Sequence, residues 1–209
     1  EIAYPIYLYA FAVNGNLAAT QTIAGADEEM SLPLSKGEYQ IVAVSGASAS
    51  YQIPENPTLD DAVTLSGSKG ADTPLMVGRA NVEINNSSNA TAQITLKYVV
   101  AALNVKLEDV PSNVTGVQLA LSPLHSTLSM AGAYGGDSHK VKVDCSLATN
   151  GIWSANTVYI FPGSGKETVF SINFKMDDGT EVTYGYTFQG IPEANHLFNV
   201  TGTYSGGVI

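Results

Sequence analysis

Few of the residue types that carry enzyme chemistry occur close together in this sequence. The three histidines share no local motif that would bind a metal ion, and they lie far apart, at His125, His139 and His196. Asp177-Asp178 has the residue types of an acid–base pair, but Gly179 follows directly, and Asp-Gly steps are typical of turns between strands. The acidic run 27–29 is interpreted as a solvated loop. The sequence therefore predicts no metal site, no cofactor and no catalytic residues.

A glycine-rich segment at residues 163–168 resembles a phosphate-binding loop only in part. The motif needs a glycine where Ile160 stands and a serine or threonine where Glu167 stands. No helical pattern follows it, so no helix N-terminus is expected to hold a phosphate. The single cysteine, Cys145, lies in a strand-like apolar alternation and is interpreted as a small buried hydrophobe rather than a nucleophile. Both features favour a protein that is not an enzyme.

Three aromatic residues do not fit the apolar alternation of a core and are therefore candidate ligand contacts. Trp153 follows Asn150-Gly151, while Tyr51 and Tyr134 lie in segments rich in serine and glycine. One interpretation is that these rings pack as lids over a core. The other is a platform on which a carbohydrate stacks, and it requires the three rings to share one exposed surface.

Composition limits the class of protein and the kinds of partner. The 209 residues are 44% hydrophobic and 13% charged, which is typical of a folded chain and excludes disorder. Nineteen acidic residues against nine basic ones give a net charge of -10, so neither nucleic acid nor an anionic membrane surface is expected as a partner. No apolar run reaches the ~20 residues of a transmembrane helix. The length allows one large domain or two small ones.

Strand-like alternation dominates the chain, and helical periodicity is nearly absent. The clearest hairpin joins residues 168–176 to 182–188 through the turn at 177–179. Only residues 58–63 have a helical start signal, and they are long enough for a turn or two. Further short strands are predicted at 4–13, 17–24, 30–34, 38–44, 81–84 and 197–204, with 30–34 paired to 38–44. Short strands without crossover helices predict an all-β protein built from antiparallel sandwiches.

A change of pattern near residue 90 suggests a domain boundary. Residues 85–89 form the most polar uncharged stretch of the chain, and a long strand-like run follows at 91–107. The apolar alternation of that run slips by one residue across 99–102. Such a slip requires a bulge, or a strand that passes from one packing environment to another. We therefore predict an N-terminal domain at 1–90 and a C-terminal domain at 91–209.

The first predicted strand, at residues 4–13, is apolar on both faces. Tyr7, Tyr9 and Phe11 share one face, and aliphatic residues occupy the other. One interpretation is a central strand that is covered on both sides by the core and by loops. The alternative is that the second face meets another domain or another subunit.

Several short segments resemble one family of bacterial surface proteins in their order and spacing. They are LYAF at 8–11 before NG at 14–15, GEYQIVA at 37–43, TPLMVG at 73–78, ITLK at 94–97, VAALNV at 100–105, LSPL at 121–124 and ANHLFNVTGTY at 194–204. Together they span nearly the full length. The chain resembles the fimbrillin-like proteins of type V pili from Gram-negative anaerobes of gut and mouth, and it is most similar to the anchor or minor-subunit family.

The resemblance implies two tandem transthyretin-like antiparallel β-sandwich domains without catalytic residues or cofactors. Such proteins are exported as lipoproteins to the outer membrane, where they assemble into surface fibres or anchor them. Their partners are other fimbrial subunits. Stalk subunits of this family lose an N-terminal strand by cleavage after arginine or lysine, and no such residue occurs here before Lys36, as expected of an uncleaved anchor. The glycine-rich tail 205–209 is too short to be expected as a donor strand.

The first functional hypothesis is therefore a cell-surface fimbrial anchor or minor subunit that assembles by β-strand addition. Two strands are candidates for the contact edge, because an edge left open in an exported protein is expected to be functional. They are the two-faced strand at 4–13 and the last strand at 197–204. The candidate contact residues are Tyr7, Tyr9, Phe11, Leu197, Asn199 and Thr201.

The alternative hypothesis is a surface glycan-binding lipoprotein or a pilus tip adhesin. Its partner would be a glycan or a protein on a host or microbial surface. Tyr51, Tyr134 and Trp153 are the candidate platform residues for that function.

Overall fold

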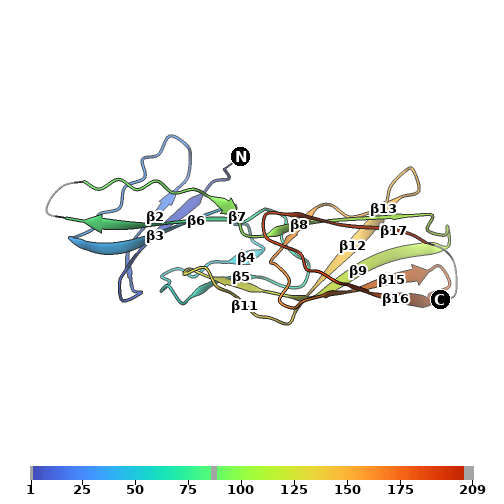
Figure 1. Cartoon of the computed structure of the whole chain (residues 1–209). Helices are drawn as coiled ribbons and strands as arrows, with labels where there is room; N and C mark the ends of the chain where they lie inside the picture. Colours follow the sequence, from blue (N-terminus) through green and yellow to red (C-terminus); the bar gives the residue numbers. More distant parts are fainter. Residues whose placement is uncertain (1, 86–88, 205–209) are drawn as a thin grey trace.

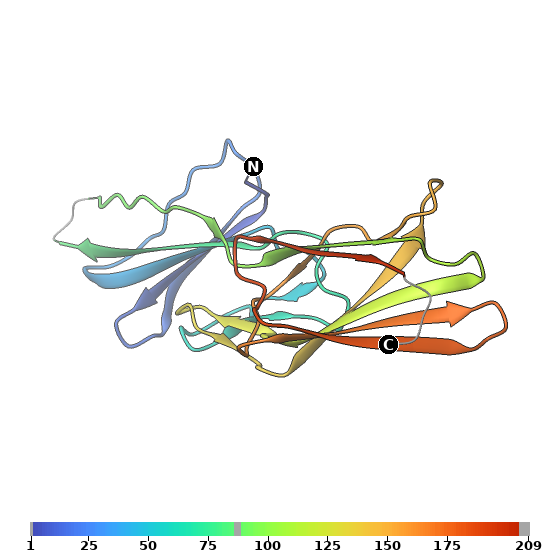
Figure 2. The ribbon, with the colours of Figure 1, turned by 45° about the vertical axis from the view of Figure 1, so that its right-hand side comes forward.

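The computed structural model describes residues 2–85 and 89–204, and all of its regular elements there are β-strands. The all-β prediction is confirmed. Two layered sheet assemblies lie end to end in an elongated molecule, as the two views in Figures 1 and 2 agree. The centre of the polar segment that marks the predicted boundary, residues 86–88, lies outside the described residues, as does the tail 205–209.

The first sandwich consists of a five-stranded sheet that packs on a four-stranded one. The larger sheet has the order β2-β1-β3-β6-β7, with bounds β1 (Ile6–Ala12), β2 (Leu17–Ile23), β3 (Gly37–Ser45), β6 (Met76–Ile84) and β7 (Lys97–Tyr98). The smaller has the order β11-β10-β5-β4, with bounds β4 (Tyr51–Gln52), β5 (Ala62–Leu65), β10 (Thr127–Ser129) and β11 (Tyr134–Gly135). Phe11, Val42, Leu128 and Phe161 are buried in the core of this sandwich.

The second sandwich is one eight-stranded sheet that folds over on itself. Its strands are β8 (Ala101–Glu108), β9 (Val114–Leu124), β12 (His139–Leu147), β13 (Trp153–Ser154), β14 (Val158–Ile160), β15 (Thr168–Met176), β16 (Glu181–Phe188) and β17 (Leu197–Thr203). Short β13 pairs with both β12 and β8, so it joins the two layers along one side. Leu103, Leu119 and Leu121 are fully buried between the layers. On the opposite side no described strand joins the layers. There β16 and β17 are edge strands, because each pairs with one strand only.

The slipped run at 91–107 is two separate elements rather than one strand. Residues 89–96 are irregular, β7 pairs with β6 in the first sandwich, and β8 belongs to the second. Val100 is buried in the first core, whereas Ala101 and Leu103 are buried in the second. The slip therefore marks a chain that passes from one packing environment to another, which was one of the two readings of the pattern.

The prediction of a strand at 30–34 is wrong. These residues are irregular, and β3 pairs instead with β1 and β6. Pro33 lacks the backbone N–H that a paired strand uses, and Leu32 packs against the outer face of the larger sheet. Of residues 58–63, the first four form a turn that leads into β5 and the last two begin that strand. In the turn Asp61 Oδ2 accepts hydrogen bonds from the Thr58 N–H and Oγ1 at 2.7 and 3.0 Å.

The two sandwiches share chain segments. The β10–β11 hairpin comes after β8 and β9 in the sequence, yet β10 pairs with β5 of the first sandwich. Arg79 on β6 holds this hairpin, because its Nε and Nη2 donate to the carbonyl oxygens of Met130 and Ser129 at 2.8 and 3.3 Å. The division at residue 90 and the transthyretin-like topology of each half stay predictions.

Candidate subunit-contact site

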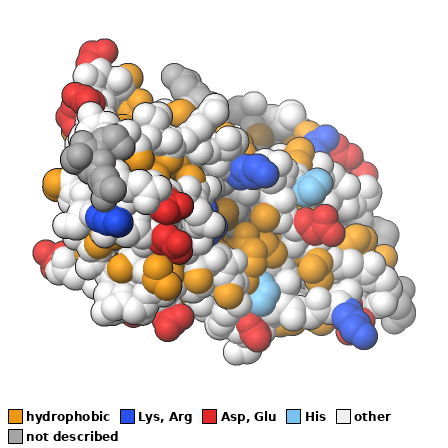
Figure 3. Space-filling model, turned by 60° about the vertical axis from the view of Figure 1, so that its left-hand side comes forward, with side chains coloured by type: hydrophobic (Ala, Val, Ile, Leu, Met, Phe, Trp, Pro, Cys, Tyr) orange, Lys and Arg blue, Asp and Glu red, His pale blue; other side chains and the backbone are white. Residues whose placement is uncertain are grey.

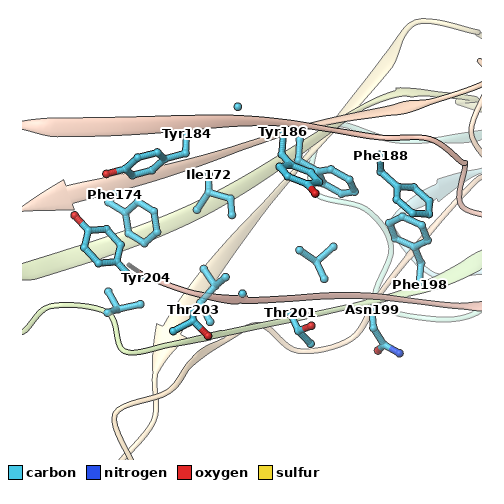
Figure 4. A pocket seen from close by; sticks show the side chains of 16 residues that line it. Ile172, Phe174, Tyr184, Tyr186, Phe188, Phe198, Asn199, Thr201, Thr203 and Tyr204 are labelled. Carbon is cyan, nitrogen blue, oxygen red and sulfur yellow. The ribbon is translucent and has the colours of Figure 1, made fainter. Parts of the chain in front are cut away.

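The open side of the second sandwich contains a groove between β16 and β17 with a volume of about 580 Å³. We call it the seam groove, and its floor is formed by side chains of β15. Figure 4 shows side chains from β16 and β17 lying on either side of it. It is lined by Leu107, Val110, Phe170, Ile172, Phe174, Tyr184, Gly185, Tyr186, Phe188 and residues 198–204. None of these lining side chains carries a charge, so the groove suits an apolar occupant.

Two aromatic clusters bridge β16 and β17 at the ends of the seam groove. At one end the Phe198 ring lies 5.9 Å from Phe170 and 5.7 Å from Phe188, measured between ring centroids. At the other end Tyr204 lies 5.1 Å from Phe174 and 6.2 Å from Tyr184. These edge-to-face and offset contacts hold the two edge strands together at each end of the groove.

The middle of the seam groove lies between the clusters and is exposed. Tyr186 shares the groove-facing side of β16 with Tyr184 and Phe188, yet 71% of its surface is exposed. Val200 of β17 also lines the groove. Ile172 of β15 lies on the floor (Figure 4). Because no strand of the described chain covers this stretch, apolar side chains stay in contact with solvent there.

Both strands that border the seam groove have one unpaired backbone edge within the described chain. β16 pairs only with β15, and β17 pairs only with β8. β17 runs parallel to β8, and the antiparallel pairs from β8 round to β16 make β16 run opposite to β17. An extended strand inserted between them would therefore run parallel to one and antiparallel to the other. Free edges of this kind are the usual template for pairing with another chain.

The Tyr204 phenol at one end of the seam groove stays neutral under physiological conditions. A hydrogen bond with Tyr184 and burial raise the pKa of Tyr204 above its ordinary value. The phenol therefore keeps its proton at any pH where the protein is expected to work.

The first strand does not provide the contact edge that its sequence suggests. β1 pairs with β2 on one side and with β3 on the other, so it has no free edge. Tyr9 and Phe11 are 4% and 0% exposed, and burial raises the pKa of Tyr9 to about 12. Tyr7 is half-buried against the same core. The prediction of a contact edge at Tyr7, Tyr9 and Phe11 is wrong, since both faces of β1 are covered by the protein itself.

The aromatic residues predicted to form a carbohydrate platform are packed into two different cores. Tyr51 and Tyr134 both contact Phe161 in the first sandwich, with ring centroids 6.4 and 5.9 Å away. Their hydroxyls donate to the carbonyl oxygens of Thr73 and Val99, each at 2.8 Å. Trp153 is buried in the second core. The three rings therefore share no exposed surface, and the lid interpretation describes them.

The last strand contributes to the site with two of its three predicted residues and with others that were not predicted. Asn199 and Thr201 are exposed and line the seam groove, whereas Leu197 does not line it, and a subunit contact through these residues stays a prediction. The groove is also lined by Phe198, Val200 and Tyr204, which the alternation pattern assigns to a core. Sequence reasoning missed Tyr186 and Phe188 for the same reason. The available signal was an apolar face on each strand. The sequence did not show that the layer opposite these faces is incomplete.

The titratable groups do not converge on a reaction centre. His125 Nδ1 lies 2.9 Å from Asp137 Oδ1 and its ring stacks on Tyr134 with the ring centroids 5.5 Å apart, and His125 does not line the seam groove. No group of three or more His, Cys, Asp or Glu side chains that could hold a metal ion is found in residues 2–85 and 89–204. Burial and the nearby Asp144 raise the pKa of the Cys145 thiol to about 11. Lysine and arginine side chains are scattered singly on the face in Figure 3 and form no basic patch there.

Within the described chain, no helix is long and apolar enough to cross a membrane.

Comparisons with known proteins give both a family and a fold. Residues 1–208 match the family described as fimbrillin-A associated anchor proteins Mfa1 and Mfa2. Among solved structures, the fimbrial anchor protein Mfa2 from Porphyromonas gingivalis is 20% identical, with a TM-score of 0.64 over 90% of this chain and 74% of that one. No curated protein matches the chain.

Two further solved structures share the fold. An adhesin candidate from Bacteroides ovatus is 11% identical, with a TM-score of 0.70 over 100% of this chain and 89% of that one. A structure from Bacteroides thetaiotaomicron, described as a candidate polysaccharide-binding protein, is 15% identical, with a TM-score of 0.64 over 90% of this chain and 72% of that one.

Proposed function

The chain belongs to the family of fimbrillin-A associated anchor proteins, and from this premise we propose that it joins a fimbrium by accepting an extended strand in the seam groove. Its role in the fimbrium is structural rather than catalytic, at the cell surface and in contact with other fimbrial subunits. The observation that carries the strand proposal is the seam groove itself. It combines two unpaired strand edges with an uncharged, partly exposed floor.

An inserted strand would provide partners for the backbone groups at the free edges of the seam groove and would cover its exposed apolar side chains. The inserted backbone would pair with the free edges of β16 and β17, and this supplies affinity without regard to sequence. Every second side chain would point inward, because side chains alternate along a strand. The inward chains would cover Tyr186, Val200 and Ile172 between the two aromatic clusters. The partner segment is therefore expected to have aliphatic residues at alternate positions.

A peptide titration tests the strand proposal. The probe is an alternating Val/Thr nonapeptide with lysine at both ends, and binding is followed by hydrogen exchange and calorimetry. We expect the amides of β16 and β17 to become protected when the peptide binds. Tyr186→Asp should weaken binding by about tenfold or more, because it places a charge on the apolar wall that β16 forms.

Thr187→Asp is the matched control for Tyr186→Asp. It adds the same charge to the next position of β16, where the side chain is exposed on the opposite face. Binding that falls equally in both variants, or protection that appears in the first sandwich instead, would contradict insertion in the seam groove.

We further propose that the protein reaches the outer membrane as a lipoprotein, as its resemblance to exported anchors implies. The intact gene is expressed in a Gram-negative anaerobe, labelled with a radioactive fatty acid and fractionated. We expect labelled protein in the outer-membrane fraction, and unlabelled protein in the periplasm would refute this placement.

A further inference from the structure

A second cavity, of about 450 Å³, lies on the outer face of the second sandwich. Its floor is formed by the exposed side of β8 and β17, and the turn between β12 and β13 forms its wall. The side chains that carry the argument are Asn104, Lys106, Asn150, Ile152, Asn199 and Thr201. We call this cavity the amide pocket.

The parallel pairing of β8 and β17 brings two asparagines together on the floor of the amide pocket. Asn199 is paired with Asn104, and Thr201 with Lys106, so all four side chains point to the same outer face. Asparagine is disfavoured in strands relative to threonine or valine. Two asparagines side by side within their strands are therefore not what an exposed sheet face needs for stability. Departures of this kind from local preference are expected where a site has a function.

The amides of the amide pocket retain unused hydrogen-bonding capacity. Asn104 Oδ1 accepts from Thr157 Oγ1 at 2.6 Å, which fixes the amide and leaves its NH₂ group available. Asn150 Oδ1 accepts from the Ile152 N–H at 3.3 Å, so its NH₂ group is available as well. The Asn199 side chain forms no hydrogen bond with any residue that the structure describes.

The charges of the side chains that line the amide pocket limit the class of ligand that it can bind. No carboxylate lines the amide pocket, so it lacks the oxygen ligands that a divalent cation prefers. Its one cation, Lys106 Nζ, is already paired with Glu108 Oε1 at 2.6 Å, so an anion would have to compete for it. What is left is a set of neutral donors and acceptors beside the apolar surface of Ile152, Ala148 and Ala155.

We propose that the amide pocket binds a neutral oligosaccharide. Each sugar hydroxyl both donates and accepts a hydrogen bond, as an amide group does, and the C–H face of a sugar ring can lie on Ile152 and the two alanines. This assignment moves the glycan contact away from Tyr51, Tyr134 and Trp153. Asn104 and Asn150 line the amide pocket alone, whereas Asn199 also lines the seam groove.

The test is a titration of the full chain, labelled with ¹⁵N, with maltoheptaose, cellohexaose, mannopentaose and lacto-N-tetraose to about 10 mM each. We expect at least one of these sugars to shift the side-chain NH₂ signals of Asn104, Asn150 and Asn199. The double variant with Asn104→Ala and Asn150→Ala, two residues that line the amide pocket and not the seam groove, should bind that sugar about tenfold more weakly, the loss that one or two hydrogen bonds imply. Asn81→Ala, an exposed asparagine on β6 of the first sandwich, is the matched control and should bind as the parent does.

Each other outcome overturns the proposal. These are the absence of shifts with all four sugars, shifts confined to another surface, or equal affinity in the double variant and the parent. The double variant should still bind the alternating Val/Thr nonapeptide with the affinity of the parent. Loss of sugar binding at the amide pocket can then be distinguished from loss of peptide binding in the seam groove. A circular dichroism spectrum identical to that of the parent shows that the double variant is folded.

Discussion

At the scale of single residues, Gly78 shows how an irregular segment is fitted to a sheet. The segment 89–96 crosses the outer face of the larger sheet, and Ile94 and Leu96 cover Ile6 and Leu8 there. A Cβ atom at position 78 would lie 2.5 Å from Ile94 Cγ2 and 2.7 Å from the Thr95 carbonyl oxygen. Only a glycine lets the segment approach β6 this closely.

We expect Gly78→Ala to lower the free energy of unfolding by about 2 kcal/mol, because backbone atoms must move apart to admit the methyl group. Urea denaturation followed by tryptophan fluorescence and circular dichroism measures the change. Gly25→Ala is the control, since nothing lies within 4 Å of the Cβ it would add. If both variants are as stable as the parent, the segment is not packed as described.

At the scale of elements, the sequence predicted local hairpins better than the pairing of strands that are far apart in the chain. The β15–β16 hairpin was predicted because alternation and an Asp-Gly turn specify it locally. The parallel pairing of β17 with β8 could not be predicted, since it joins strands about ninety residues apart with no local signal for direction. The segment 30–34 was misassigned because its central apolar residue, Leu32, covers a sheet, and no residue of the segment pairs in one.

The candidate site was only partly predictable for the same physical reason. Phe188, Phe198 and Tyr204 alternate as core residues do, and alternation cannot tell whether the opposing layer is complete. Asn199 and Thr201 were selected as exposed residues of the last strand, and they line both the amide pocket and the seam groove. Which face of a strand is open depends on the packing of the whole sheet.

At the scale of the whole molecule, the β10–β11 hairpin couples the two sandwiches. β9 of the second sandwich leads directly into β10, which pairs with β5 of the first. Arg79 fixes the hairpin from β6 through two carbonyl contacts, and burial lowers its pKa without removing its charge at neutral pH. A pull on one sandwich is therefore transmitted through paired strands rather than through a loose linker.

We expect Arg79→Ala to reduce stability by about 2 kcal/mol, because it removes two hydrogen bonds from a charged donor. Hydrogen exchange of the β10 and β11 amides should accelerate more than that of β15. Arg79→Lys keeps the charge but not the two-point geometry, so it should fall between Arg79→Ala and the parent. Lys97→Ala removes an exposed cation from β7 and is the control. If Arg79→Ala leaves hydrogen exchange in β10 and β11 unchanged, Arg79 does not hold the hairpin.

The shared core also constrains the order in which the chain can fold as it emerges from a ribosome or a secretion channel. Val100, Leu128, Met130 and Phe161 are all buried in the first sandwich. The first 90 residues alone lack these side chains, so the apolar face of the larger sheet would be exposed to solvent. The core of the first sandwich therefore cannot be completed until about three-quarters of the polypeptide has emerged. During that interval the N-terminal part is exposed to proteases and is expected to need chaperones.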